Sequence, residues 1–176
     1  MKAFAALYNE LDRSTATLDK RAALIAYFQK AAGEDAAWAL WLLSGAKLGK
    51  IANSRELREW ISVESGIPIW LVDDSYDQVG DLAETVTLLL DDPAQCEADV
   101  PLHVWIEQRL LPVAGHDPNL RHAAVVAGWR TLAFGERLVF NKLLTGALRV
   151  GVSQRLVQQA LTEMSGVEVA RIAQRM

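Results

Sequence analysis

Apolar residues recur at spacings of three and four along most of the 176-residue chain, which is the pattern of amphipathic helices. In residues 18–31, for example, one apolar stripe consists of Leu18, Ala22, Ile25 and Phe28. No segment shows the strict alternation, bounded by turns, that predicts a strand. The pattern therefore predicts an all-α fold, a compact domain of about ten or eleven helices joined mostly by short loops.

Residues that favour helix ends divide this pattern into separate helices. Ser54, Asp81 and Ser153 are predicted N-caps, and Gly66 is predicted to end a helix. The helices predicted in this way are 18–31, 34–44, 55–65, 68–79, 82–90, 101–111, 120–134, 136–145, 153–165 and one from 167 onward.

The chain also contains an internal repeat. The first copy begins with Leu-Leu-Ser-Gly-Ala at 42–46, and the second with Leu-Leu-Thr-Gly-Ala at 143–147. In each copy a Gly-containing basic loop follows, and a Ser starts the next helix; the first loop is two residues longer. Two copies are too few for a solenoid. They predict a pseudo-two-fold domain in which about 35–66 superposes on about 136–166.

Each of these loops has features that suit a phosphate group. Glycine permits positive φ and close backbone approach, and the N-terminus of the following helix offers unpaired N–H groups and a positive dipole. Lys47, Lys50 and Arg55 add charge to the first loop, and Arg149 and Arg155 to the second. Two such loops can hold two phosphates or the two strands of a duplex. The alternative is a pair of helix–turn–helix corners in which Gly and Ser only cap helices.

The charges are unevenly distributed along the chain. The formal net charge is −4, yet the stretch from Glu59 to Glu107 holds 12 acidic residues and no Lys or Arg. The rest of the chain therefore carries a positive surplus, which indicates a basic face. Composition alone favours an ordinary soluble protein with solvated charges.

Several segments follow the pattern of one known family. Residues 143–153 contain Leu-Thr-Gly-Ala-Leu-Arg-Val-Gly-Val, and residues 80–84 read Gly-Asp-Leu-Ala-Glu. The opening and the start of the second predicted helix add Phe4, Leu7, Leu11, Lys20 and the stretch 35–39. In this order the segments resemble the N-terminal DNA-binding domain of ATP-dependent DNA ligases, in particular its bacterial members, over nearly the whole chain.

The resemblance implies a single all-helical DNA-binding domain, residues 1–176, that lies on the minor-groove side of nicked double-stranded DNA. It implies loop contacts to the phosphates beside the nick, in support of nick sealing in DNA repair, replication and recombination. The second loop matches the family pattern directly, and the repeat extends the contacts to the first loop, whose greater length leaves its register open. The implied DNA-binding residues are Gly45, Lys47, Gly49, Lys50, Ser54, Gly146, Arg149, Gly151, Val152 and Ser153.

The ligase nucleophile is absent from the sequence. It is a lysine in a Lys-x-Asp-Gly motif, and none of the six lysines here stands in that context. The chain alone is therefore expected to be non-catalytic, with no cofactor of its own. ATP and Mg²⁺ are expected only in the catalytic domain, which with an oligonucleotide-binding (OB) domain is expected to follow in the same polypeptide.

Other residue types point to no further chemistry. The three histidines lack the i, i+4 spacing of metal ligands, and Cys96 has no activating base nearby in the sequence, so no metal or catalytic site is predicted. Four tryptophans fall on apolar stripes and are predicted to be core: Trp38, Trp41, Trp60 and Trp129. The other two, Trp70 and Trp105, are predicted to be partly exposed.

No export signal and no apolar run of membrane-spanning length occur, so a monomeric protein of the cytoplasm, associated with the nucleoid, is expected. A second function class stays open beside DNA binding. It is a helical protein-interaction module that uses the acidic stretch from Glu59 to Glu107 to meet a basic partner and does not bind DNA.

Overall fold

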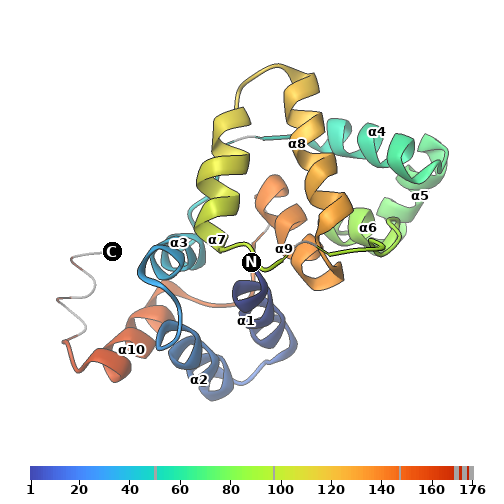
Figure 1. Cartoon of the computed structure of the whole chain (residues 1–176). Coiled ribbons are helices and arrows are strands. Elements are labelled where there is room, and N and C mark those ends of the chain that lie inside the picture. The colour runs from blue at the N-terminus through green and yellow to red at the C-terminus, as the bar shows by residue number, and fades with distance from the viewer. Residues whose placement is uncertain (50, 97, 147, 169–170, 172–173, 175–176) are drawn as a thin grey trace. The chain divides into compact units, whose positions relative to one another are not determined.

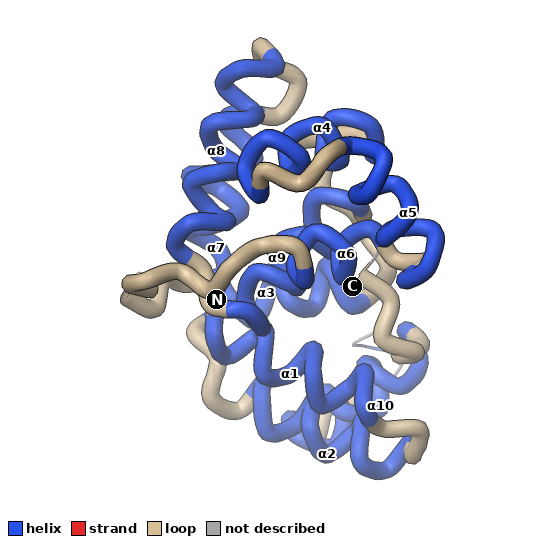
Figure 2. Tube along the Cα trace, turned by 90° about the vertical axis from the view of Figure 1, so that its right-hand side faces the viewer, coloured by secondary structure: helices blue, strands red, loops and turns tan. Residues whose placement is uncertain are grey.

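Helices and loops make up the computed structural model (Figures 1 and 2), which describes residues 1–49, 51–96, 98–146, 148–168, 171 and 174. No strand occurs among these residues, so the all-α prediction is confirmed. The α-helices are α1 (Lys2–Arg13), α2 (Thr17–Phe28), α3 (Gly33–Leu43), α4 (Ser54–Ser65), α5 (Ile69–Val79), α6 (Leu82–Leu88), α7 (Leu102–Val104), α8 (Pro118–Thr131), α9 (Phe134–Thr145) and α10 (Gln154–Ser165). The helix predicted from residue 167 onward lies largely outside the described residues.

The predicted helix over 101–111 differs from the observed structure. There α7 is followed by a π-helix, η1 (Trp105–Leu110), and a 3₁₀ turn, η2 (Leu111–Val113). Pro112 has no N–H to continue an α-helical ladder, and its ring would clash with the carbonyl group four residues earlier. The hydrogen-bonding pattern therefore changes before the proline, which the apolar periodicity alone does not reveal.

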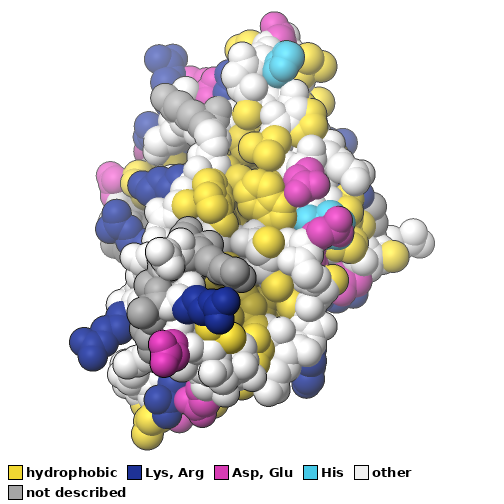
Figure 3. All heavy atoms as spheres, turned by 90° about the vertical axis from the view of Figure 1, so that its left-hand side faces the viewer, with side chains coloured by type: hydrophobic (Ala, Val, Ile, Leu, Met, Phe, Trp, Pro, Cys, Tyr) yellow, Lys and Arg dark blue, Asp and Glu magenta, His cyan; other side chains and the backbone are white. Residues whose placement is uncertain are grey.

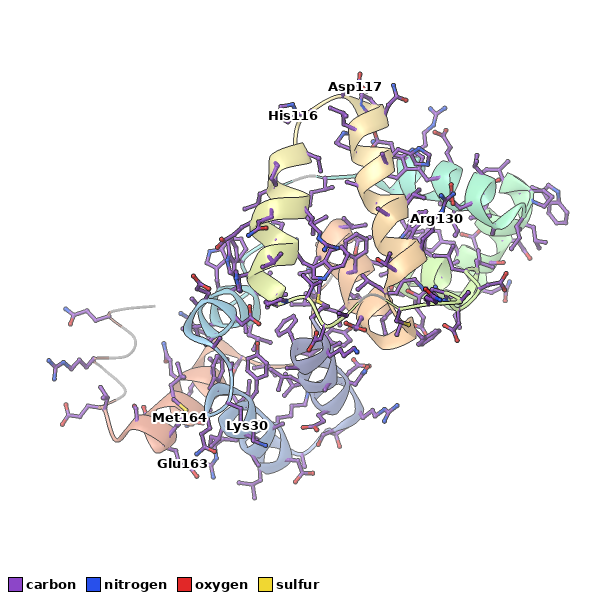
Figure 4. The ribbon with its side chains drawn as sticks, in the orientation of Figure 1. Lys30, His116, Asp117, Arg130, Glu163 and Met164 are labelled. Carbon is purple, nitrogen blue, oxygen red and sulfur yellow. The ribbon has the colours of Figure 1, made fainter. Side chains whose placement is uncertain are left out.

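The chain folds as two compact units. Unit 1 comprises residues 1–47, 101–103 and 148–176 and contains α1, α2, α3 and α10. Its centre is α2, which packs against both α1 and α10. Phe4 and Leu11 of α1 and Leu24 of α2 are buried, and the rings of Phe4 and Tyr27 meet edge to face with centroids 6.1 Å apart. Arg21 of α2 also pairs with Glu163 of α10 at 3.2 Å. Figure 4 labels Glu163 on α10.

Unit 2 comprises residues 48–100 and 104–147 and contains α4, α5, α6, η1, η2, α8 and α9. Trp129 of α8 and Phe140 of α9 are buried at its centre, with Trp105 of η1 edge to face against Phe140 at 5.5 Å. Gly128 permits the close approach of α8 and α9, since a Cβ there would lie 2.7 Å from the Phe140 ring.

Polar groups in unit 2 are buried together with this apolar core. Trp129 Nε1 donates to Asn141 Oδ1 at 2.7 Å, and Asn141 Nδ2 donates to Thr87 Oγ1 at 3.0 Å. Arg137 of α9 has an exposed side-chain fraction of 1% and donates to the carbonyl groups of Thr87, Leu90 and Asp91 at the end of α6. Buried hydrogen bonds of this kind favour one arrangement of helices, because another arrangement would leave their donors and acceptors unpaired.

The exposure of the tryptophans corrects part of the prediction. Trp129 is core and Trp70 is exposed, as predicted. The predictions for Trp41 and Trp105 are wrong, because Trp41 is 40% exposed and Trp105 is buried against Phe140. Apolar side chains reach the surface elsewhere too, as the face in Figure 3 shows, and apolar atoms make up much of the surface of any folded protein. None of the described helices is both long and apolar enough to cross a membrane.

Candidate nucleic-acid interface

The second loop joins α9 to α10. Gly146 ends α9 in the left-handed conformation with φ 65°, and Gly151 has φ 59° just before α10. Arg149 and Gly151 are exposed, Val152 is half-buried, and Val150 is buried. Positive φ is costly for any residue with a Cβ, so Gly146 and Gly151 have a backbone reason to be glycine.

A buried lysine holds this loop in place. Lys20 of α2 is 8% exposed, and its Nζ donates to the carbonyl oxygens of Val150 at 2.6 Å and Gly151 at 3.3 Å. A Cβ at Gly151 would lie 2.9 Å from the same Nζ. The loop conformation therefore depends on Lys20, whose role the sequence analysis missed. Its only signal was its place in the opening segment that resembles the ligase domain.

The start of α10 presents unused hydrogen-bond donors. Ser153 is the N-cap, as predicted, and its Oγ accepts from the N–H of Leu156 at 3.2 Å. The N–H groups of Gln154 and Arg155 have no acceptor in the described part of the chain. Arg149 and Arg155 are exposed and form no ion pair with a described residue. Donors, helix dipole and free positive charge together suit an anion such as a phosphate.

The first loop joins α3 to α4 and is described except for Lys50. Gly45 follows α3 with φ 94°, and Lys47 is exposed and forms no ion pair with a described residue. Gly49 is exposed but does not have a left-handed φ, and a Cβ there would meet nothing within 4 Å. The backbone therefore requires glycine at Gly45 and not at Gly49. The predicted contact at Lys50 lies outside the described residues.

The N-cap of α4 is Asn53, so the prediction that Ser54 caps this helix is wrong. The Asn53 side chain accepts from the N–H of Glu56 at 2.9 Å, and the Glu56 carboxylate accepts from the N–H of Asn53 at 2.8 Å. This reciprocal capping box satisfies two groups at once, whereas a serine one residue later satisfies one. Ser54 becomes the first residue of α4 and is exposed.

An arginine braces the first loop much as Lys20 braces the second. Arg121 of α8 donates to the carbonyl oxygen of Ile51 at 2.8 Å and, through both Nη atoms, to the Glu56 carboxylate at 2.9 and 2.7 Å. Arg121 therefore fixes the buried end of the loop and the capping box. The sequence analysis missed Arg121 because nothing in its local pattern distinguishes it from a surface arginine.

The Gly-Asp-Leu segment has a structural role in unit 2. Asp81 is the N-cap of α6, as predicted, and accepts from the N–H of Glu84 at 3.0 Å. Its other oxygen pairs with Nζ of Lys142, a buried lysine of α9. Burial would raise the pKa of Asp81, but the hydrogen bonds from Lys142 and Glu84 and the Lys142 charge outweigh it and lower the pKa below its usual value.

Asp81→Asn should destabilise the protein at neutral pH and much less in acid. The folded-state pKa lies below that of the unfolded chain, so the carboxylate contributes stability above about pH 4 and loses it as the pH falls through the folded-state pKa. We expect a loss of about 2–3 kcal/mol near pH 7, because Lys142 loses its partner. Urea denaturation of both proteins from pH 7 to pH 3 measures the difference. A difference that stays constant over this range would contradict the assignment.

Among the described residues, no three His, Cys, Asp or Glu side chains gather into a group able to hold a metal ion. His103 is engaged by Asp35, whose Oδ1 lies 2.6 Å from Nδ1, and Cys96 is exposed.

A family of known proteins matches most of the chain, including both loops. Residues 1–162 match the protein-family model described as DNA ligase N terminus. The match includes both loops and every helix from α1 to α9, and it ends within α10. No curated protein sequence matches the chain.

Proposed function

The chain belongs to the family of DNA ligase N-terminal domains, and from this premise we propose that it binds nicked double-stranded DNA through the phosphates beside the nick. The start of α10 carries the proposal. There the N–H groups of Gln154 and Arg155 lack an acceptor among the described residues, and Arg149 and Arg155 are exposed. Gly151, whose carbonyl accepts from Lys20, lies in the same segment, which resembles the ligase pattern. We assign the contacts to the residues predicted from sequence in the two loops.

Binding of this kind reads the DNA backbone and not its bases. Lys, Arg and main-chain N–H groups that meet phosphates position a protein on a duplex and carry no direct sequence information. The domain therefore binds the minor-groove side of the duplex, with little preference for any DNA sequence. Its proposed setting is nick sealing in repair, replication and recombination, at the nucleoid in the cytoplasm.

The chemistry of ligation belongs to other domains in this proposal. No lysine of the chain stands in a Lys-x-Asp-Gly motif, so the residues present do not fit an adenylation site. A catalytic domain and an OB domain of the same polypeptide use ATP and Mg²⁺ and close around DNA that this domain holds. Here it acts as a monomer and contributes affinity and position.

Arg149→Ala should weaken binding to nicked duplexes of different sequence by the same factor. Loss of one phosphate contact should also reduce the slope of log affinity against log salt concentration by roughly one. Arg55→Ala is the matched control, since Arg55 already pairs with Glu59 at 2.7 Å and should matter less. Fluorescence anisotropy with labelled nicked duplexes at several salt concentrations measures both effects.

An unchanged affinity and salt slope in Arg149→Ala would remove the second loop from the interface. A chain that binds no duplex at any salt concentration would instead favour the protein-interaction module. A loss that depends on base sequence would contradict backbone reading.

The isolated chain should form no covalent adenylate. Incubation with labelled ATP and Mg²⁺, followed by a denaturing gel, should give no labelled band at its mass, because no lysine has the required neighbours. A labelled band would contradict the non-catalytic assignment.

A further inference from the structure

The face that α5 shows to solvent, together with the end of α4, has features that the DNA-binding proposal does not use. These two helices of unit 2 lie side by side (Figure 1) and are joined by a short turn at Gly66. Arg58 of α4 and Asp73 of α5 pair at 2.6 Å, which fixes the packing of the two helices. Only Val72 of α5 is buried. Most of this helix therefore faces water.

Large apolar side chains are exposed on this face. Trp70 is 67% exposed and Val63 is 73% exposed, and both lie next to the turn between the helices. Ile69 and Leu71 are also exposed. Groups of exposed apolar side chains rimmed by polar residues are a feature of protein-contact sites. Tryptophan in particular is enriched among the residues that dominate binding energy.

The charge next to these side chains is negative and unneutralised. Asp74 and Asp77 follow Trp70 by one and two helical turns, so the three share one stripe of α5. Both aspartates are exposed and form no ion pair with a described residue. They belong to the stretch from Glu59 to Glu107, which contains no Lys or Arg. A tryptophan face beside carboxylates attracts Arg and Lys side chains, through cation–π contact and ion pairing together.

We propose that this face, defined by Val63, Ile69, Trp70, Leu71, Asp74 and Asp77 and called the α5 face below, is a docking surface for a partner protein that presents a basic segment with apolar anchors. The charge complementarity selects a basic partner and disfavours DNA, since the phosphates would meet Asp74 and Asp77. The α5 face is thus a second binding surface, separate from the loop residues that we assign to DNA.

The test uses the full chain and a labelled amphipathic peptide of Arg and Leu, with the same peptide carrying Glu for Arg as the charge control. Trp70→Ala should weaken binding of the Arg peptide about tenfold or more, as expected of a central anchor. Asp74→Asn with Asp77→Asn should weaken it and flatten its salt dependence. Leu120→Ala, which removes another exposed apolar side chain of unit 2, is the matched control and should leave binding within about twofold.

Nicked-duplex affinity measured on the same variants separates this proposal from the DNA-binding one. Trp70→Ala should bind the duplex as the parent does. Equal peptide binding by Trp70→Ala and the parent, or equal binding of the Glu peptide, would overturn the proposal. A loss of duplex affinity in Trp70→Ala would place the α5 face in the DNA interface. Self-association of the parent that Trp70→Ala abolishes in sedimentation would make a second copy the occupant.

Discussion

Gly151→Val should weaken binding to nicked duplex by about ten- to a hundredfold. The backbone at Gly151 has φ 59°, where a β-branched residue costs about 1–3 kcal/mol. The added Cβ would also lie 2.9 Å from Lys20 Nζ. The loop must therefore leave the conformation that holds the start of α10 and Arg149, although the protein loses no charge. Anisotropy with labelled nicked duplex measures the loss, and each 1.4 kcal/mol corresponds to tenfold.

Two further variants separate loop conformation from general damage. Gly33→Ala is the matched control, since Gly33 lies outside both loops, lacks a left-handed φ and has open space around it, and it should bind within about twofold of the parent. Lys20→Met should reproduce part of the Gly151→Val defect, because the carbonyl groups of Val150 and Gly151 lose their donor. If Gly151→Val and Lys20→Met each bound nicked duplex as the parent does, the result would contradict a role of the second loop in DNA binding.

Arg137→Met should cause the largest loss of stability, about 3–5 kcal/mol. Arg137 is buried, and it donates to three carbonyl groups at the end of α6, of which that of Asp91 lies at 2.8 Å. Methionine fills similar volume but leaves the buried carbonyl of Thr87 and the part-buried carbonyls of Leu90 and Asp91 without this donor. An unsatisfied buried acceptor costs about 1–3 kcal/mol. Urea denaturation followed by tryptophan fluorescence measures the free energy of unfolding.

The matched control concerns Asp92, whose carboxylate lies near this guanidinium. Asp92 Oδ1 lies 3.5 Å from Arg137 Nη2, but its side chain is 77% exposed. Asp92→Asn should therefore change the free energy of unfolding by less than about 1 kcal/mol, as exposed ion pairs do. If Arg137→Met lowered the free energy of unfolding by less than about 1 kcal/mol, water would be replacing the hydrogen bonds of Arg137 at no cost in stability. That result would contradict the structural role given to Arg137 in unit 2.

The sequence predicted those features that local chemistry determines. The helical class, the caps at Asp81 and Ser153, and the glycine ends at Gly66 and Gly146 follow from neighbours within one or two turns. The family follows from short segments of fixed order, and the match over residues 1–162 confirms it. The superposition of the two repeat copies and the individual DNA contacts stay predictions.

The features that the sequence did not predict depend on contacts between distant residues. Lys20 and Val150 are 130 positions apart, so no local pattern shows that a buried amine supports the second loop. Arg121 reaches Glu56 across 65 positions, and Arg137 reaches Asp91 across 46. The error at Ser54 is of another kind, because two neighbouring residues were both good caps. Asn53 is the N-cap because it and Glu56 form two reciprocal hydrogen bonds, each from a backbone N–H to the other residue's side chain.

The most direct test of DNA binding by the loops is a map of backbone amide shifts by NMR as nicked duplex is added. The account predicts the largest shifts at Gly151, Gln154 and Arg155, with further shifts at Ser54, and none at Asp74 of the α5 face. Shifts confined to the α5 face, with the starts of α4 and α10 unchanged, would contradict the central claim that the glycine loops hold the phosphates.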